Sequence, residues 1–499
     1  MPGTQIIAID CGTQSVRCLI VDVDTGAHSV GATESIALRP MVGNRIEVDP
    51  GLIAAATIRV LRSTLALCPT PVSIAITNMR ETAIAWDKKT GEPVHDGIMW
   101  MSQQSQNIVD RWSDAGLSEQ IRVKTGLSNH TFFFGSKIAW LLDARPDIGA
   151  DAAAGRVAVG TVDSWLLFVL TGGATHATDV SNASRYQLLN LQDLEWDGEL
   201  AEALGIPLAA LPAIHPTSSD FGFTDVGIVG ARIPITGMIG DQQASLLGHD
   251  CVSVGDAKAT FGTSCVVGVN LGAEATLGEG LVTSVAWSHA NESVVYEMEG
   301  SAFHSGFTVT WLDRILQLPA NSNALVTRST VPPEGRVAVV PSFTELGAPR
   351  WLKGRGASIH GLTMDTDARD ILRAGIESMA FQAFDLVSAV PNAQRHGPLS
   401  VDGGAASNDY MCQLLADLAN RVIVRPPSRE LTGFGAARAA AAFLGIDIPA
   451  SSREEGACAQ FVPAADRSYA EGGFEHWQKV TQSTLEAGSR EARVPELLG

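Results

Sequence analysis

The chain has 499 residues, of which 45% are hydrophobic, so it can form more than one sizeable core and is not a disordered chain. Its 35 Lys and Arg residues are outnumbered by 54 Asp and Glu residues, which gives a formal net charge of −19. A surface this acidic repels the phosphate backbone of nucleic acids, so we expect no nucleic-acid partner.

We expect a soluble, cytoplasmic protein without membrane insertion. The most apolar window, 433–446, contains Arg438 and is shorter than the roughly 18 residues that a spanning helix needs. The first residues lack the basic and apolar regions of a signal peptide. The seven cysteines are scattered and have no metal-ligand spacing, so we expect reduced thiols rather than disulfides or a zinc site.

The first half of the chain alternates short apolar runs with helical patterns. Residues 5–10 and 16–22 are strand-like and are separated by a short turn with a glycine, which predicts a hairpin. A helix is predicted over 49–66, and strands over 72–77 and 83–87. The alternation continues to about residue 245 and indicates an α/β fold with a mixed sheet.

A second half of similar character begins near residue 256. A strand over 256–261, a turn of small residues and a strand over 265–269 repeat the opening pattern of the chain. The segment that joins the halves, 242–250, is predicted to be a short helix. Further helices are predicted by apolar periodicity over 367–390, 407–420 and 431–444.

Three motifs place glycines and hydroxyl side chains in turns beside strands. They are 10–17 (DCGTQSVR), 260–265 (TFGTSC) and 401–408 (VDGGAASN). Backbone N–H groups in such turns, and at the start of a helix, suit phosphate oxygens. An acid such as Asp10 can hold a hydrated Mg²⁺, and Arg17 can reach a phosphate. Each motif alone is also explained as an ordinary turn, but the three together favour nucleotide binding.

Further blocks carry a resemblance to a known family, the FGGY carbohydrate kinases, and within it to the glycerol kinases. The resemblance extends over nearly the whole chain. Its blocks are 77–82 (TNMRET), 86–87 (WD), 98–100 (IMW), 160–166 (GTVDSWL), 179–185 (DVSNASR), 196–197 (WD), 240–244 (GDQQA), 299–300 (EG), 346–349 (LGAP), 357–362 (ASIHGL) and 376–378 (IES).

The resemblance implies an α/β fold of two actin-like, ribonuclease-H-like domains with a central cleft. Residues 1–246 would form the N-terminal domain, with the polyol site and the first phosphate loop, and 247–499 the nucleotide-binding C-terminal domain. It further implies an enzyme that uses ATP and Mg²⁺ to phosphorylate a terminal hydroxyl of a small polyol, and a homodimer or homotetramer. The cleft must close to exclude water, because a kinase that admits water hydrolyses ATP.

The resemblance also assigns roles to single residues. Asp241, which follows a strand-like run and Gly240, resembles the family's general base; as an isolated pattern it is equally an acid that begins a helix. Asp10 resembles the Mg²⁺-associated acid. The polyol-binding positions are Arg80, Glu81, Trp100, Phe132, Asp241, Gln242 and Val266. The positions that resemble nucleotide contacts are Thr13, Gln14, Ser15, Arg17, Thr263, Gly306, Gly404 and Asn408.

The chain departs from the glycerol kinase pattern at positions that would line the polyol pocket. Phe132 stands where those enzymes have a tyrosine, Val266 where they have a phenylalanine, and 101–104 (MSQQ) replaces a more polar segment. The pocket therefore loses a hydrogen-bonding group and gains volume. Glycerol remains the first expectation, with a tetritol, a pentitol or a ketose next.

Other functions remain open at this point. A catalytically silent sugar sensor would not need Asp10, Asp241, Arg80 and Glu81 together, and a chaperone-like or filament ATPase would not need the polyol-binding pair. Gly230 and Arg232 coincide with positions that bind an inhibitory sugar bisphosphate in some bacterial relatives. They are also explained as the residues that precede a strand.

Overall fold

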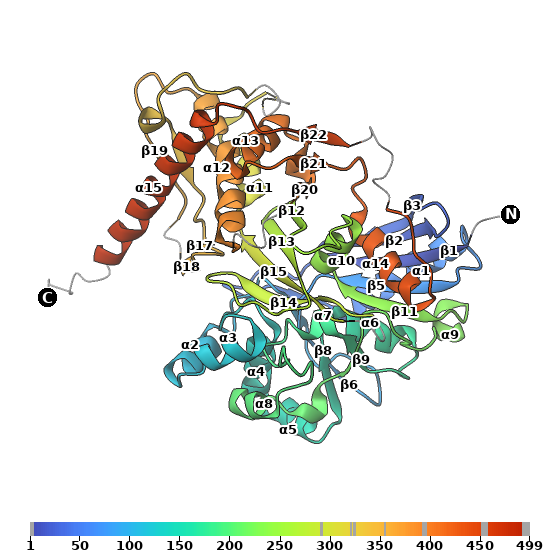
Figure 1. Ribbon diagram of the computed structural model, residues 1–499. Helices are drawn as coiled ribbons and strands as arrows, with labels where there is room; N and C mark the ends of the chain where they lie inside the picture. The colour runs from blue at the N-terminus through green and yellow to red at the C-terminus, as the bar shows by residue number, and fades with distance from the viewer. Residues whose placement is uncertain are drawn as a thin grey trace, which may run out of the picture.

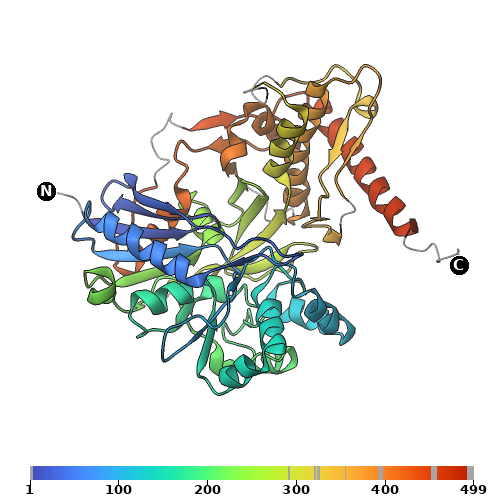
Figure 2. The ribbon, with the colours of Figure 1, turned by 180° about the vertical axis from the view of Figure 1, so that it is seen from behind.

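The computed structural model describes residues 4–289, 293–319, 322, 326–353, 356–391, 397–450 and 458–491. The chain forms two lobes, which Figure 1 shows from one side and Figure 2 from behind. The lobe that contains most of the first half has these elements: β1 (Gln5–Cys11), β2 (Ser15–Asp22), β3 (His28–Ser35), β4 (Glu47–Val48), α1 (Pro50–Leu65), β5 (Ser73–Asn78), β6 (Ile84–Asp87), β7 (Gly97–Ile98), α2 (Gln106–Asp114), α3 (Ser118–Thr125), α4 (Phe134–Ala144), α5 (Pro146–Ala153), β8 (Val157–Gly160), α6 (Val162–Leu170), β9 (Ala177–Asp179), α7 (Val180–Ala183), α8 (Gly198–Leu204), β10 (Ala213–His215), α9 (Val226–Val229), β11 (Ile235–Gly240) and α10 (Asp241–Gly248).

The second half begins with a strand and ends with a long helix that reaches out from the upper lobe in Figure 1. Its elements are β12 (Ala257–Phe261), β13 (Cys265–Gly272), β14 (Val282–Trp287), β15 (Val295–Ala302), α11 (Ser305–Leu316), β16 (Ala338–Val340), β17 (Glu345–Leu346), β18 (Leu352–Lys353), β19 (Ser358–His360), α12 (Ala368–Ala389), β20 (Leu399–Asp402), α13 (Asp409–Ala419), β21 (Ile423–Arg425), α14 (Leu431–Phe443), β22 (Ala459–Phe461) and α15 (Ser468–Glu491).

The first lobe is built on a five-stranded sheet in the order β11-β5-β1-β2-β3. β1, β5 and β11 are parallel, whereas β1, β2 and β3 are antiparallel neighbours, so the sheet is mixed as predicted. Because side chains of a strand alternate between faces, Ile7 and Ile9 pack with α1, and Ile6 and Ala8 pack with α14. Figures 1 and 2 show these two helices on opposite faces of the sheet.

α14 comes late in the chain, yet it covers the sheet of the first lobe. It packs against β11, β5 and β1, and most closely against α10. The close contact between α14 and α10 depends on two glycines. A Cβ added to Gly435 would lie 1.8 Å from the carbonyl oxygen of Ala244, and a Cβ added to Gly248 would lie 2.0 Å from the carbonyl oxygen of Leu431. Helix 431–444 was predicted correctly, but its place beside the first sheet was not.

The second lobe is built on a seven-stranded sheet in the order β14-β15-β13-β12-β20-β21-β22. β12 and β13 form the predicted second hairpin, and β12 runs parallel to β20. α12 and α13 pack on this sheet around a large apolar core that includes Ile376 and Leu415. The segment 401–408 differs slightly from its prediction, because a short 3₁₀ turn over Gly404–Ser407 precedes α13.

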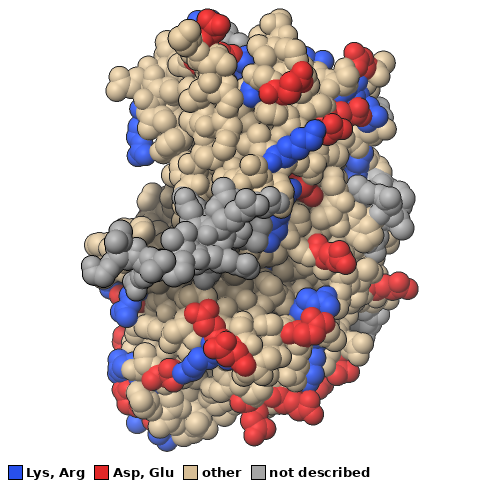
Figure 3. All heavy atoms as spheres, turned by 90° about the vertical axis from the view of Figure 1, so that its left-hand side faces the viewer, with Lys and Arg blue, Asp and Glu red and all other residues tan. Residues whose placement is uncertain are grey.

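The predicted mixed α/β fold with two lobes is confirmed, whereas the domain boundary at residue 246 stays a prediction. On the face drawn in Figure 3 the surface is hollowed between the upper and the lower lobe. Within the described ranges, no helix is both long and apolar enough to cross a membrane. The cysteines of the described segments form no disulfide.

Candidate active site

The register of the first sheet brings the predicted acids and bases to one edge. In the parallel part of the sheet, Asn78 lies opposite both Cys11 and Gly240, so β1, β5 and β11 end side by side. Side chains that follow the carboxyl ends of adjacent parallel strands meet at that edge. This arrangement places Asp10, the 80–81 pair and Asp241 in one neighbourhood.

Asp241 is the first residue of α10 and contacts the buried Arg80. Arg80 Nε lies 3.2 Å from Asp241 Oδ1, and the Gln242 backbone N–H donates to the same oxygen at 2.7 Å. The Asp241 side chain remains 28% exposed, whereas that of Arg80 is 4% exposed. Burial raises the pKa of Asp241, although the Arg80 charge opposes this rise. Asp241 is thus an oriented, reachable carboxyl group that can accept a proton.

Arg80 lies across the backbone of Gly240, which must lack a side chain for this contact. A Cβ at that glycine would lie 2.8 Å from Arg80 Cδ. On its other side the Arg80 guanidinium is bound by Glu299, with Nη1 2.7 Å from Oε2. The neighbouring Glu81 has a left-handed backbone, with φ of 60°. A residue other than glycine adopts this conformation at a cost, and such positions concentrate at functional sites.

The hairpin between β1 and β2 carries the predicted metal acid and phosphate contacts. Arg17 Nε lies 3.5 Å from Asp10 Oδ2, and Arg17 Nη1 lies 3.1 Å from Oε2 of Glu430, which precedes α14. Burial raises the pKa of Asp10 to about 7, with Arg17 lowering it and Asp241 and Glu430 raising it further. The hairpin also contains Thr13, Gln14 and Ser15, of which Ser15 begins β2.

An aromatic wall continues from the hairpin turn. Trp100 Nε1 donates to Thr13 Oγ1 at 3.1 Å, and its ring lies 5.7 Å from that of Phe132 at an angle of 76°. The Phe132 ring also lies 5.9 Å from that of Phe303. Val266 is buried on β13, opposite Thr260 of β12. Trp100 and Phe132 therefore lie together, and Val266 comes from the other sheet.

Gln242 connects the first lobe to the second through a lysine that the sequence did not indicate. Lys258 Nζ donates to Gln242 Oε1, and to Thr260 Oγ1 at 3.0 Å. Lys258 is on β12 and is fully buried. A buried charge is costly unless it is paired, so this lysine in a buried strand indicates a polar site.

Four of the predicted nucleotide positions line one cavity at the edge of the second sheet. Since β12 and β20 are parallel and Thr260 lies opposite Asp402, the turns that follow them meet at one edge. Between these turns, α11 and α12 lies a cavity of about 520 Å³. Its lining includes Thr263, Gly306, Gly404 and Asn408. The structure thus brings together the second and third motifs.

Several residues of the site were missed as functional positions. Arg185 Nε donates to Glu81 Oε1 at 2.6 Å, and Arg185 Nη2 lies 3.1 Å from Glu299 Oε1. Asp402, on the strand that leads to the cavity of about 520 Å³, lies 3.0 Å from His249 Nε2. Burial opposes ionisation of Asp402, but His249 lowers its pKa to about 2. Arg185 and Glu299 lie within the sequence blocks that resemble the family, but the sequence does not show that they contact each other and Glu81.

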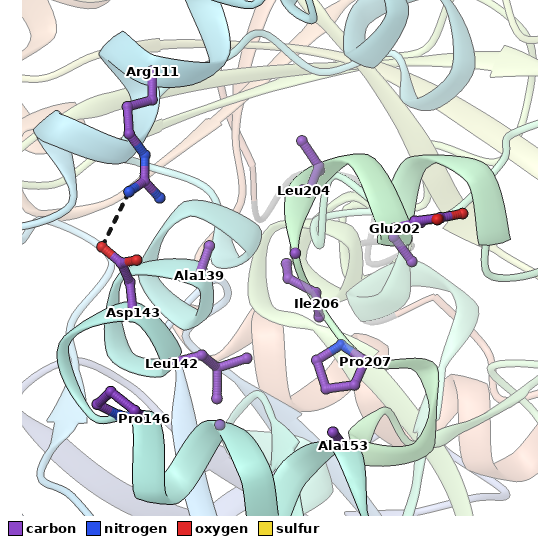
Figure 4. Close-up of a pocket in the computed structure, with 13 residues that line it drawn as sticks. Arg111, Ala139, Leu142, Asp143, Pro146, Ala153, Glu202, Leu204, Ile206 and Pro207 are labelled. Atoms are coloured by element: carbon purple, nitrogen blue, oxygen red, sulfur yellow. Dashed lines mark hydrogen bonds and ion pairs between the residues drawn. The ribbon is translucent and has the colours of Figure 1, made fainter.

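A second cavity, of about 530 Å³, lies on the outside of the first lobe. It opens between α4, α5 and α8, and its lining is mainly apolar, with Leu142, Leu204 and Ile206 (Figure 4). An ion pair between Arg111 and Asp143, 3.2 Å long, borders it. None of the predicted site residues lines this cavity, so it is separate from the candidate active site.

The donor groups at the first sheet edge fit a magnesium ion that arrives with a nucleotide. Mg²⁺ is usually held by one or two carboxylates, with phosphate oxygens and waters as its other ligands. The described residues contain no cluster of three or more His, Cys, Asp or Glu placed to bind a metal, but they provide Asp10 with Asp241 nearby. The positive charge of a cation there would stabilise the ionised carboxylates and so oppose the rise in pKa that burial causes in both acids.

Comparison with known proteins gives the family. Residues 5–248 match the N-terminal domain, and 257–444 the C-terminal domain, of the FGGY family of carbohydrate kinases. Glycerol kinase of Shewanella sp. (strain MR-7) is 39% identical over 494 residues, which cover 97% of this chain and 100% of the relative.

Solved structures have the same fold. Plasmodium falciparum glycerol kinase with ADP superposes with a TM-score of 0.87 at 29% identity, over 97% of this chain and 98% of that chain. Ligand-bound xylulose kinase from Lactobacillus acidophilus gives a TM-score of 0.84 at 20% identity, over 98% of this chain and 99% of that chain. The chain belongs to the FGGY family of carbohydrate kinases.

Proposed function

We propose that the protein transfers the terminal phosphoryl group of ATP to a terminal hydroxyl of a small polyol. Glycerol, which gives glycerol 3-phosphate, is the first candidate. The observation that carries this proposal is the position of Asp241, a reachable carboxyl group at the start of α10 that is oriented by the buried Arg80. Two further observations support the same activity. The chain belongs to the FGGY family of carbohydrate kinases, and four of the residues predicted to contact a nucleotide line one cavity.

Asp241 is the general base in this proposal. Its carboxylate accepts the proton of the attacking hydroxyl, the hydroxyl oxygen forms a bond to the γ-phosphorus, and ADP leaves with the electrons of the broken bond. Arg80 keeps Asp241 in place, and its charge favours the ionised form that the base requires. Phosphoryl transfer needs positioning and charge neutralisation more than covalent chemistry, so one base is sufficient.

The polyol lies between polar groups of the first lobe and apolar groups that come from both lobes. Arg80 donates to its hydroxyls and Glu81 accepts from them, while Gln242 adds a further polar contact. Trp100, Phe132 and Val266 provide apolar walls for the carbon chain. A four- or five-carbon polyol or a ketose is the second candidate, because Phe132 has no hydroxyl to bind glycerol and Val266 fills less of the pocket.

The nucleotide lies on the second lobe, with its phosphates toward the β1–β2 hairpin. Thr263, Gly306, Gly404 and Asn408 would contact it from the cavity, and Thr13, Gln14, Ser15 and Arg17 from the hairpin. Asp10, with Asp241 nearby, would hold Mg²⁺, which when bound supplies positive charge that neutralises the phosphates. The residues of the hairpin then orient the γ-phosphoryl group toward Asp241.

An assay of ADP release, with and without polyol, tests the proposed function. Stimulation by polyol supports a kinase, whereas ADP release that polyol does not change would indicate an ATPase. A protein that binds polyol but releases no ADP would be the silent sensor. A panel of three- to five-carbon polyols and ketoses then ranks kcat/KM; glycerol loses its place if a larger substrate exceeds it greatly. A cytoplasmic location, the homodimer or homotetramer, and the bisphosphate site at Gly230 and Arg232 stay predictions.

A further inference from the structure

A buried arginine, Arg185, lies behind the groups that would bind the polyol. It follows the short helix α7 and is fully buried. Its guanidinium contacts two acids at once, with Nε 2.6 Å from Glu81 Oε1 and Nη2 3.1 Å from Glu299 Oε1. Such charge-assisted contacts from a rigid fork fix the geometry of the acids that they hold.

Glu299 in turn joins Arg185 to Arg80. Glu299 Oε1 accepts a hydrogen bond from Arg185 Nη2, and Glu299 Oε2 lies 2.7 Å from Arg80 Nη1. Burial opposes its ionisation, but the charges of the two arginines hold the pKa of Glu299 below its usual value. Glu299 contacts Arg80, Arg185 contacts Glu81, and Glu299 and Arg185 contact each other. The orientation of the Arg80 side chain is therefore coupled to that of Glu81.

Arg185 also underlies the aromatic wall. Its guanidinium carbon lies 5.2 Å from the ring centre of Phe133 and 6.0 Å from that of Phe132. A third N–H group, on Nη1, donates to Ser284 Oγ of β14 at 3.4 Å. The arginine therefore connects the Glu81 loop, the Phe132 segment and the second sheet, while none of its surface is open to a substrate.

We propose that Arg185 is a positioning residue for polyol binding, which orients the Glu81 carboxylate and fixes it relative to Arg80 through Glu299. This inference rests on the proposed function. Without Arg185, Glu81 would keep its charge but lose its fixed direction, and its left-handed backbone would lose the contact that supports it. Polyol binding should weaken, while nucleotide binding at the cavity of the second lobe should not.

The first test compares Arg185→Met and Arg185→Lys with the native protein. In Arg185→Met the KM for polyol should rise about tenfold or more, with a smaller fall in kcat and a KM for ATP within about twofold of native. Arg185→Lys keeps the positive charge but loses the forked guanidinium, so its KM for polyol should lie between that of the native protein and that of Arg185→Met. The control is Arg328→Met, which removes the partner of another buried acid, Asp417, 2.6 Å away, outside the site.

A double-mutant cycle separates positioning from general loss of stability. If Arg185 acts through Glu81, then the effects of Arg185→Met and Glu81→Gln on the KM for polyol should be strongly non-additive. Arg185→Met with Glu299→Gln removes one negative charge together with the positive one, so it restores the local charge balance and should recover thermal stability without recovering the KM. Additive effects, or a KM that recovers together with stability, would overturn the proposal. If the native protein shows no polyol-dependent turnover, then the proposed function has failed instead.

If Arg185→Met alone does not fold, Arg185→Lys and the charge-balanced double variant still decide the question. Both are measured for Tm, ADP affinity and polyol KM on the full chain. A native KM for polyol in either folded variant would contradict the positioning role. A raised KM with native ADP affinity would support it, because a purely structural defect would affect both ligands.

Discussion

The guanidinium of Arg80 holds Asp241 at 3.2 Å, so the acid that would accept the substrate proton is oriented by a residue that would also bind the substrate. Asp241→Asn keeps the shape and a hydrogen-bond acceptor but removes the proton acceptor. We expect kcat to fall by about 10²- to 10⁴-fold, with ATP binding nearly unchanged. Single-turnover kinetics and an ADP titration measure the two effects separately. A kcat within tenfold of native would show that another group is the base.

The pocket walls predict a change in substrate preference. Phe132→Tyr restores a hydroxyl, and Val266→Phe reduces the volume, so the double variant should shift kcat/KM toward glycerol relative to a five-carbon polyol. One added hydrogen bond of about 0.5–1.5 kcal/mol corresponds to roughly a twofold to tenfold change in this ratio. Phe133→Tyr, at the neighbouring aromatic, is the matched control. An unchanged ratio would mean that Phe132 and Val266 do not line the polyol pocket.

Two glycines of the cavity in which we propose that the nucleotide binds should respond differently to alanine. A Cβ at Gly306 would lie 2.3 Å from the Gly262 carbonyl oxygen, whereas nothing among the described residues lies within 4 Å of one at Gly404. Gly306→Ala should therefore lower Tm by several degrees and weaken ATP binding, because two backbones are pushed apart. Gly404→Ala should leave Tm within about 1 °C and raise the KM for ATP only.

The Gly404→Ala variant is the sharper of the two tests, because its methyl group would meet a nucleotide rather than the protein. Its polyol KM serves as the internal control. An unchanged KM for ATP would show that the nucleotide does not approach Gly404.

A buried lysine predicts a pH-dependent stability. Lys137 Nζ donates to the carbonyl oxygens of Phe132, at 2.6 Å, and Phe133, at 2.9 Å. Burial lowers its pKa from 10.5 to about 7. Between these two values the unfolded chain binds more protons than the folded one, so this group makes folding more favourable as pH rises from about 7 to 10.5.

The measurement is the difference in unfolding free energy between the native protein and Lys137→Met. This difference should rise with pH across that window in favour of the native protein, as measured by denaturant unfolding. Lys89→Met, at an exposed position in the turn after β6, is the control. A difference that stays constant from pH 7 to 10 would contradict the argument.

The residues that the sequence predicted best are those at strand ends. A strand, a glycine and an acid predicted the local structure around Asp241, and the family resemblance then singled it out; the structure places it at the end of β11 as the first residue of α10. The hairpins of both halves were predicted by local patterns of strand, turn and strand. These features depend on neighbours in the sequence, and the sequence records them directly.

The contacts between distant segments could not be predicted in the same way. Arg185 and Glu81 are 104 positions apart, and Arg185 and Glu299 are 114 apart. The sequence around each of these residues does not show which residue it contacts, because the contacts depend on how the two sheets pack together. A charged residue within a buried strand, as at Lys258 or Glu299, shows only that a polar site exists. The role that each plays follows from the three-dimensional arrangement.

The position of α14 has a consequence for how the protein is made. One face of the first sheet, with Ile6 and Ala8, is covered by a helix that ends at Phe443. A ribosome adds residues from the N-terminus, so that face stays open to water until most of the chain has emerged. The first lobe therefore contains the strands that are synthesised first, but its core is complete only after α14 has been synthesised. A shortened chain that stops at residue 430 should aggregate rather than yield a stable first lobe.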